Sequence, residues 1–207
     1  MRGLLLLIED CVFRNNTAAT KGGAVSIQDG GIVREISRTT FSNNSAGDSS
    51  VEWSGGQGGA ISIASQASLG LVRESIFTGS MAQKRGAPSG GAIYSVHNGE
   101  SLLINVRFEA NLPDDITIDN PKARIRMHGT NPVKVTGSVS GCEPGEHFNA
   151  PGWTPGDPVC SKCPRGRFMD ETNDGSKAGN LHSSCKPCAA GKASDATGLA
   201  SGSQCTD

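Results

Sequence analysis

Six of the seven cysteines lie close together near the C-terminus, and thiols at this density cross-link a chain or bind a metal ion. They are Cys142, Cys160, Cys163, Cys185, Cys188 and Cys205. Four of them form two Cys-x-x-Cys pairs with 21 residues between the pairs, a spacing close to that of a four-cysteine zinc ribbon. The first and last cysteines bracket those pairs and would be idle in a zinc site. The pattern therefore favours disulfides, with zinc binding as the alternative.

The other groups that could do chemistry show no catalytic arrangement. Asp114 and Asp115 are adjacent, and neighbouring residues of a strand point to opposite faces. His97 and His128 have no identifiable partner, and neither a nucleophile elbow nor an HExxH motif occurs. Cys11 stands alone and is expected to point inward as a small hydrophobe. We expect no enzyme and no cofactor, with a polysaccharide lyase or hydrolase as the alternative.

Composition divides the 207-residue chain into two parts. Residues 142–207 hold most of the cysteines but few large apolar side chains, so they need covalent or metal cross-links to keep a shape. The net charge of −1 argues against a nucleic-acid-binding protein, which usually carries a basic excess. The longest apolar run, Leu4–Ile8, is far shorter than the ~20 residues that a membrane-spanning helix needs, so no transmembrane segment is expected.

The first part contains a repeated tetrapeptide, Gly-Gly-Ala followed by Val or Ile. Its copies begin 36 and 32 residues apart. Glycine pairs let a chain turn with positive φ, and the following Ala and β-branched residue suit the start of a buried strand. The predicted turn glycines are Gly22, Gly23, Gly58, Gly59, Gly90 and Gly91.

A second motif, Phe-x-x-Asn, alternates with the glycine motif. Each Phe follows a strand-like run, and the third copy along the chain, Phe77–Ser80, is degenerate and lacks the Asn. The Phe is expected to stack in a narrow core. The Asn is expected to take the left-handed conformation of the following turn and to bond the Asn one coil away. The predicted core residues are Phe13, Phe41, Phe77, Phe108, Asn16, Asn44 and Asn111.

Each repeat is too short to bury its own apolar face, so neighbouring repeats must stack. The period-two alternation after each Gly-Gly-Ala indicates strands. The sequence thus predicts an all-β fold: a parallel β-helix, or solenoid, over residues 4–137, right-handed, followed by a small disulfide-rich module over residues 142–207. Variable loops are expected at Gly47–Gly56 and Ser80–Pro88, between a Phe motif and the next Gly-Gly-Ala.

On these two motifs, residues 4–137 resemble the repeats of the chlamydial polymorphic membrane proteins and related β-helical surface adhesins. The resemblance implies a secreted or cell-surface β-helix used for adhesion. No C-terminal membrane β-barrel follows the repeats in this sequence. We therefore expect a piece of a larger extracellular or cell-surface protein, adhesive or structural, with an unidentified protein or glycan ligand.

The C-terminal part is also repetitive, since three units open with Cys-x-x-Gly. It resembles the ephrin-receptor-like cysteine-rich module, related in style to EGF-like and tumour-necrosis-factor-receptor repeats, which implies an extracellular disulfide-linked module. Six cysteines allow fifteen connectivities. Pairing the first cysteine of each unit with its last suggests Cys142–Cys160, Cys163–Cys185 and Cys188–Cys205.

Two Asn-x-Ser/Thr sequons overlap the Phe-x-x-Asn motif and make Asn15 and Asn43 candidate glycosylation sites. The motif asparagine is the next residue in each case. A sugar on Asn15 or Asn43 could therefore still face water.

Overall fold

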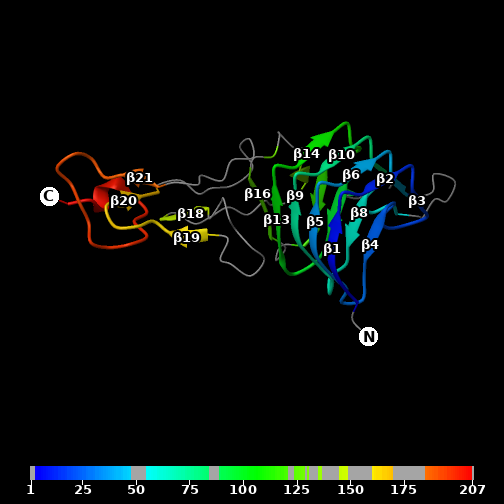
Figure 1. Ribbon diagram of the computed structural model, residues 1–207, viewed down its shortest axis with the longest axis horizontal. Coiled ribbons are helices and arrows are strands. Elements are labelled where there is room, and N and C mark those ends of the chain that lie inside the picture. Colours follow the sequence, from blue (N-terminus) through cyan, green and yellow to red (C-terminus); the bar gives the residue numbers. More distant parts are fainter. Residues whose placement is uncertain are drawn as a thin grey trace. The chain divides into compact units, whose positions relative to one another are not determined.

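The computed structural model describes residues 3–47, 55–83, 89–120, 124–128, 130, 135–136, 145–148, 160–169 and 185–206. Its contacts divide the chain into two compact units, Met1–Val139 and Ser140–Asp207. The first unit is built from parallel strands and the second from short antiparallel pairs (Figure 1).

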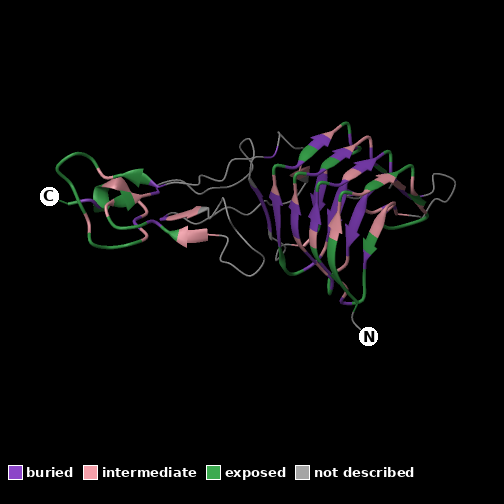
Figure 2. Ribbon diagram, in the orientation of Figure 1, coloured by how far each residue is buried: buried purple, intermediate pink, exposed green. Residues whose placement is uncertain are grey.

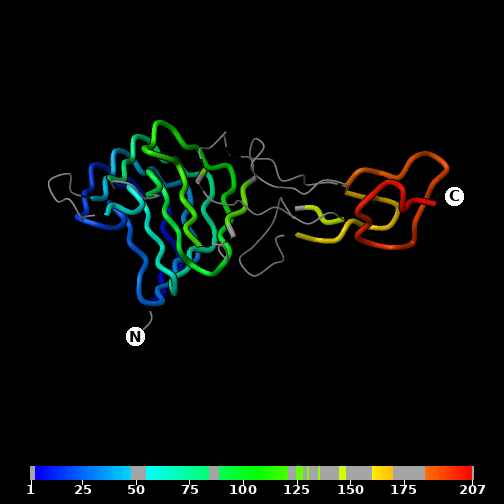
Figure 3. The backbone as a smooth tube through the Cα atoms, turned by 180° about the vertical axis from the view of Figure 1, so that it is seen from behind, coloured from blue at the N-terminus to red at the C-terminus, as the bar shows by residue number. Residues whose placement is uncertain are grey.

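In the first unit the chain passes through four sheets in turn and then returns to the first, so that each circuit makes one coil (Figures 1 and 3). The first coil comprises β1 (Leu4–Glu9), β2 (Val12–Arg14), β3 (Thr17–Ala18) and β4 (Val25–Ile27). The second comprises β5 (Ile32–Ser37), β6 (Thr40–Ser42), β7 (Ser45–Ala46) and β8 (Ile61–Ile63). The third comprises β9 (Ser68–Arg73), β10 (Ile76–Thr78), β11 (Met81–Ala82) and β12 (Ile93–Ser95).

The fourth coil comprises β13 (Glu100–Ile104), β14 (Arg107–Glu109) and β15 (Ile116–Ile118), and the described part of the next coil comprises β16 (Arg124–His128) and β17 (Val135–Thr136). Every strand pairing in this unit is parallel and joins one coil to the next. The predicted parallel β-helix is therefore confirmed.

Register places equivalent residues of successive coils above one another. Phe41 pairs with Phe13 on one side and with Phe77 on the other. Ile61 likewise pairs with Val25 and with Ile93. Because a one-residue slip would move each buried side chain to the other face, the repeated motifs fix this register.

The core lies inside the coils (Figure 2). Its largest side chains are those of Phe41 and Phe77, each 0 % exposed. Ala60 and Ala92, which follow glycine pairs, belong to the same cluster and are small enough to lie beside a corner of the coil. Each coil supplies one layer, so the interior is a stack of matching layers.

Two corners of each coil are made by residues with positive φ. Three residues before each Phe, φ is 45° to 52°; two residues after it, φ is 52° to 59°. The first set is Asp10, Arg38, Glu74 and Asn105, and the second is Asn15, Asn43, Gly79 and Ala110. The expectation that the motif Asn takes the left-handed turn was therefore wrong: the residue before it does, which leaves the motif Asn free to turn its amide inward.

The regular structure of the second unit, in its described residues, consists of short strands and one 3-10 helix. In it β18 (Glu146–Phe148) pairs with β19 (Cys160–Lys162), and β20 (Arg167–Phe168) pairs with β21 (Lys186–Pro187), both antiparallel. A 3-10 helix, η1 (Gly202–Gln204), follows Ser201, whose side chain caps it. Among its described residues the buried cluster consists of Cys163, Met169 and Cys185, so a disulfide lies at the centre of this cluster.

Candidate functional site

The two glycines of each pair serve different purposes. The first, at Gly22, Gly58 and Gly90, has φ between 44° and 68°, a conformation that favours glycine. A Cβ on the second would collide with the backbone of the next coil. At Gly59, for example, it would meet the carbonyl of Gly91 and the backbone of Met81. The equivalent glycines, Gly23 and Gly91, are equally crowded. The pair is a scaffold corner where two backbones come close together.

The four phenylalanines form one continuous stack. Ring centroids lie 5.0, 4.7 and 5.1 Å apart along the series, with interplanar angles of 5°, 3° and 10°. Phe77, from the degenerate copy of the motif, is a full member of it. The members are Phe13, Phe41, Phe77 and Phe108.

The motif asparagines bind the coil before their own. The Asn44 amide donates to the Phe13 carbonyl at 3.0 Å, and its oxygen accepts from the backbone N–H of Asn16 at 3.1 Å. The Asn16 side-chain amide also donates to that oxygen, at 2.9 Å. Between the third and fourth coils, Asn111 likewise donates to the Phe77 carbonyl and accepts from the backbone N–H of Ser80. Asn44 and Asn111 are thus buried structural bridges between coils, whereas Asn16 of the first coil is half-buried.

Ser80 interrupts this asparagine column. It occupies the place of the motif Asn and is 0 % exposed, yet its hydroxyl has no hydrogen-bond partner. A serine side chain is too short to span the distance to the neighbouring coil that asparagine spans. The degenerate third motif therefore keeps its Phe but loses its bridge.

Asn15 and Asn43 lie on the outside of the same corner. Both are exposed and have positive φ. The hydroxyl residues of their sequons, Thr17 and Ser45, stand one above the other with their oxygens 3.2 Å apart. Glycosylation stays a prediction, and the exposed side chains are compatible with it.

The backbone of the acidic pair takes part in the hydrogen bonds between neighbouring coils. The carbonyl of Asp114 accepts from Gly91 N at 2.5 Å, and that of Asp115 accepts from the backbone N–H groups of Ala92 and Ile93. The Asp115 carboxylate also accepts from Asn111 at 2.8 Å. These contacts connect the pair to the preceding coil, opposite a glycine corner.

His97 has partners that the sequence did not reveal. It is 0 % exposed, with the Ser95 hydroxyl 2.5 Å from Nδ1 and the Ser101 hydroxyl 3.4 Å from Nε2. The Ser101 hydroxyl donates to the Leu69 carbonyl at 2.6 Å. Burial lowers the pKa of His97, since the interior disfavours the charged imidazole.

A second polar contact across coils also lacked any sequence signal. The Tyr94 hydroxyl donates to Asp119 at 2.7 Å and accepts from the Gln57 amide at 3.2 Å. Tyr94 is 2 % exposed, and this burial, with the nearby Asp119 carboxylate, raises the pKa of its phenol. The three residues are far apart in sequence and belong to no repeated motif, so only the coil register brings them together.

Cys11 is a free, half-buried cysteine whose thiol donates to the Glu9 carbonyl at 3.1 Å. It borders an open hollow on the first coil, which Leu5, Leu7 and Phe13 also line. The expected inward orientation is compatible with this placement.

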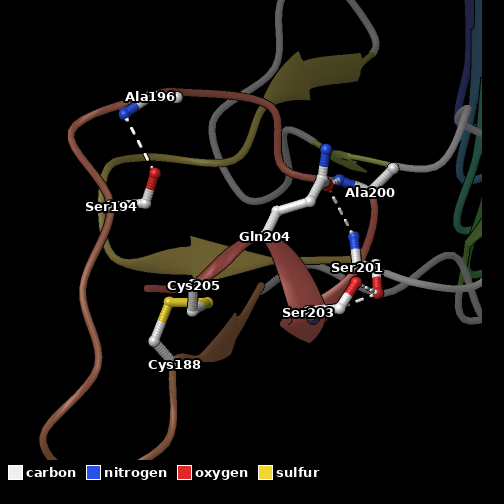
Figure 4. The surroundings of a disulfide bond; sticks show 8 residues. All are labelled: Cys188, Ser194, Ala196, Ala200, Ser201, Ser203, Gln204 and Cys205. Atoms are coloured by element: carbon white, nitrogen blue, oxygen red, sulfur yellow. Dashed lines mark hydrogen bonds between the residues drawn. A yellow bond between two sulfur atoms is a disulfide. The ribbon is translucent and has the colours of Figure 1, made fainter. Parts of the chain in front are cut away.

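In the second unit, Cys163 is bonded to Cys185 and Cys188 to Cys205 (Figure 4 shows the latter). These are two of the three disulfides predicted from the spacing of the units, and the third, Cys142–Cys160, stays a prediction. Cys160 is also in a disulfide, while Cys142 lies outside the described residues. A four-cysteine zinc site would need Cys163 and Cys188 as thiolates, and the structure has both in separate disulfides.

The cross-linked C-terminal loop carries a small hydrogen-bonded cap. Gln204 accepts from the backbone N–H groups of Ala200 and Ser201, at 2.7 and 3.0 Å, and the Ser201 hydroxyl accepts from Ser203 N at 3.2 Å (Figure 4). A Cβ on Gly202 would contact the Phe168 ring, so this Phe packs against the same turn. The second unit is thus organised around its disulfides.

A family model of the Chlamydia polymorphic membrane protein repeat matches residues 10–28 and 38–64. The matched ranges hold the Phe-x-x-Asn and Gly-Gly-Ala motifs of the first two coils. The described residues include no helix with the length and apolar character that crossing a bilayer requires. Comparisons with curated proteins and with solved structures give no match. The matched coils are thus similar to the repeat of a surface-type, outer-membrane family.

Proposed function

We propose that this chain is a non-catalytic extracellular or cell-surface protein, in which a β-helix presents loops to a protein or glycan ligand. The observation that carries the proposal is that the coils differ in length at one position of the repeat. From each Gly pair to the next Phe, the chain takes 19, 19 and 18 residues (22 to 41, 58 to 77 and 90 to 108). From each Phe to the next Gly pair it takes 9, 17 and 13 (13 to 22, 41 to 58 and 77 to 90).

All of the large variation therefore lies between the third strand of a coil and its glycine corner. Elsewhere the coils are nearly constant, because those segments form the stacked sheets. Segments that vary on a constant scaffold are typical of binding surfaces, since a loop can change without disturbing the core.

In the second coil, hydrogen bonds to the neighbouring coils hold the two ends of the variable segment. Gly47 N donates to the Ala18 carbonyl of the first coil, and Gly56 N donates to the Gln83 carbonyl of the third. A Cβ on Gly47 would lie 3.0 Å from the Cα of Gly56, so the chain leaves and rejoins the coil at almost one point. An insertion at this point lengthens the presented segment and leaves the ladder intact.

An extracellular setting is supported by the disulfides, which persist in oxidising compartments. It is also supported by the surface-type family whose repeat the first two coils match. The adhesive role and the ephrin-receptor-like character of the second unit belong to the proposal.

The test is to replace residues 48–54 and 84–88 of the full chain with Gly-Ser segments of equal length and to measure binding to cultured cells and to a glycan array. We expect saturable binding by the parent chain and at least a tenfold loss in the variant, with unchanged circular dichroism. Ile32→Ser with Arg34→Ser, at exposed positions of β5, is the control and should bind normally. Unchanged binding by the loop variant would contradict the proposal.

The enzyme alternative is tested on the same preparations. Cleavage of polygalacturonate or a similar polymer, abolished by Asp114→Asn or Asp115→Asn, would overturn the non-catalytic assignment.

A further inference from the structure

We propose that His147, Cys163 and Cys185 form a three-ligand zinc site when the disulfide between the two cysteines is reduced. Their candidate ligand atoms, one from each residue, all lie within 4.8 Å of one another. This is the one such group of three or more His, Cys, Asp or Glu side chains among the described residues. Imidazole nitrogen and thiolate sulfur are the ligands that zinc prefers.

The backbone explains how His147 reaches the cysteines. It lies on β18, opposite Ser161 of β19, and Cys163 is two residues after Ser161, directly beyond the end of that strand. Side chains two residues apart along a strand point to the same face. The Gly145 carbonyl also accepts from Cys163 N at 2.7 Å, which holds this end of β18 against Cys163.

The burial and the missing hydrogen bond of the His147 side chain also indicate a ligand. Its Nδ1 atom is buried and has no hydrogen-bond partner in the described part of the chain. Buried polar atoms are normally satisfied, so the imidazole has an unused nitrogen, and one of its two nitrogens lies within 4.8 Å of both sulfur atoms. The two cysteines lie in a buried cluster with Met169: Met169 is 1 % exposed, and Cys163 and Cys185 are 0 % and 4 % exposed.

The geometry requires only a small opening. The Cα atoms of Cys163 and Cys185 are 5.8 Å apart. Two thiolates on one tetrahedral zinc ion, each at about 2.3 Å from the metal, stand about 3.8 Å apart. Rotation about the two Cα–Cβ bonds supplies most of that separation, and a water molecule completes the four ligands.

A thiol or phosphine reductant gives two electrons to the S–S bond, which breaks and takes up two protons to give two thiols. A dithiol becomes a disulfide in return, or a phosphine takes oxygen from water and becomes its oxide. Zinc binding then releases both thiol protons to solvent. The ion would thus hold the same two chain segments together in the reduced chain.

The site differs from the four-cysteine zinc ribbon considered from the sequence, because it uses His147 and needs neither Cys160 nor Cys188. The Cys188–Cys205 disulfide belongs to no such described group and is an internal comparison. The two sites can therefore be separated by substitution.

The experiment titrates Co²⁺, and then Zn²⁺ in competition, into the full chain reduced with a phosphine under nitrogen. We expect one tetrahedral Co²⁺ per chain, with thiolate-to-cobalt absorption, and none in the oxidised chain. His147→Ala should weaken binding at least tenfold and Cys163→Ser should abolish it. His182→Ala and the double variant Cys160→Ser, Cys188→Ser should bind as the parent does.

Three outcomes would overturn the proposal. The first is that the reduced chain takes up no metal. The second is that His147→Ala binds as tightly as the parent. The third is that the double variant loses binding while His147→Ala keeps it. The last result would assign the ion to the four-cysteine site.

Discussion

The two units of this chain keep their shapes by opposite means. The solenoid stacks like residues on like, so that one layer of Phe, Ile and Ala repeats through its coils. In the described part of the second unit three side chains form a buried cluster, and two of these are the halves of a disulfide. Register stabilises the first and covalent bonds stabilise the second. The difference teaches that each unit should fail under a perturbation that the other tolerates.

The largest expected effect is on the solenoid. Phe77→Ala removes a fully buried ring between two stacked neighbours and should destabilise the solenoid by about 3–5 kcal/mol. Urea unfolding followed by circular dichroism measures the loss. Val12→Ala, at a side chain that is 65 % exposed, is the matched control and should have little effect. Equal effects of the two substitutions would contradict the stacked core.

Removing one cross-link should act on the second unit alone. Cys163→Ser with Cys185→Ser opens a loop of sequence separation 22 and should cost about 3 kcal/mol in the chain-entropy description. Hydrogen exchange should rise across residues 160–206 and stay unchanged in the solenoid. Loss of protection in the solenoid as well would show that the two units do not fold separately.

Acid should weaken the solenoid through His97. Because burial lowers its pKa, the folded protein holds the imidazole neutral, whereas the unfolded chain takes up a proton below about pH 6.5. The stability contributed by the neutral form is therefore complete above that pH and declines as pH falls towards the folded pKa. Comparing unfolding midpoints at pH 7.5 and 5.5 measures the decline, which His97→Gln should reduce. A parent chain as stable at pH 5.5 as at 7.5 would rule this out.

The smallest expected effect is a gain. Ser80→Asn restores the missing member of the asparagine column, where the new amide would bridge to the Phe41 carbonyl and Asn44 N as its neighbours do one coil away. We expect about 1 kcal/mol of added stability, measured by thermal unfolding. Ser80→Ala, which only removes the unpaired hydroxyl, serves as the reference. A destabilised Ser80→Asn variant would mean that the coils leave no room for the amide.

The repeated residues of the solenoid could be predicted from the sequence. Phe, Gly-Gly-Ala and the motif Asn recur because each coil presents the same surface to the next, so periodicity alone places them. It did not predict the left-handed Arg38 and Glu74, whose residue types give no signal for positive φ. The stacking of neighbouring corners imposes that conformation.

The sequence also failed where contacts occur only once. His97 meets two serines that are near it in sequence but belong to no repeated motif, and Tyr94 meets Asp119 across coils without any recurring spacing. His147 approaches Cys163 and Cys185 only because β18 pairs with β19. Such contacts depend on the three-dimensional register, which has to be known before they can be read.

The shared register has a consequence for how such a chain can change over generations. Every coil offers the next one the same faces, so an in-frame duplication or deletion of one whole coil gives new neighbours that already match. A gain or loss of part of a coil between a glycine pair and the next Phe would break the ladder, whereas the same change between a Phe and the next glycine pair would not. One coil is thus the unit that can be duplicated or deleted, and mutation can alter the number of coils and their outer segments independently.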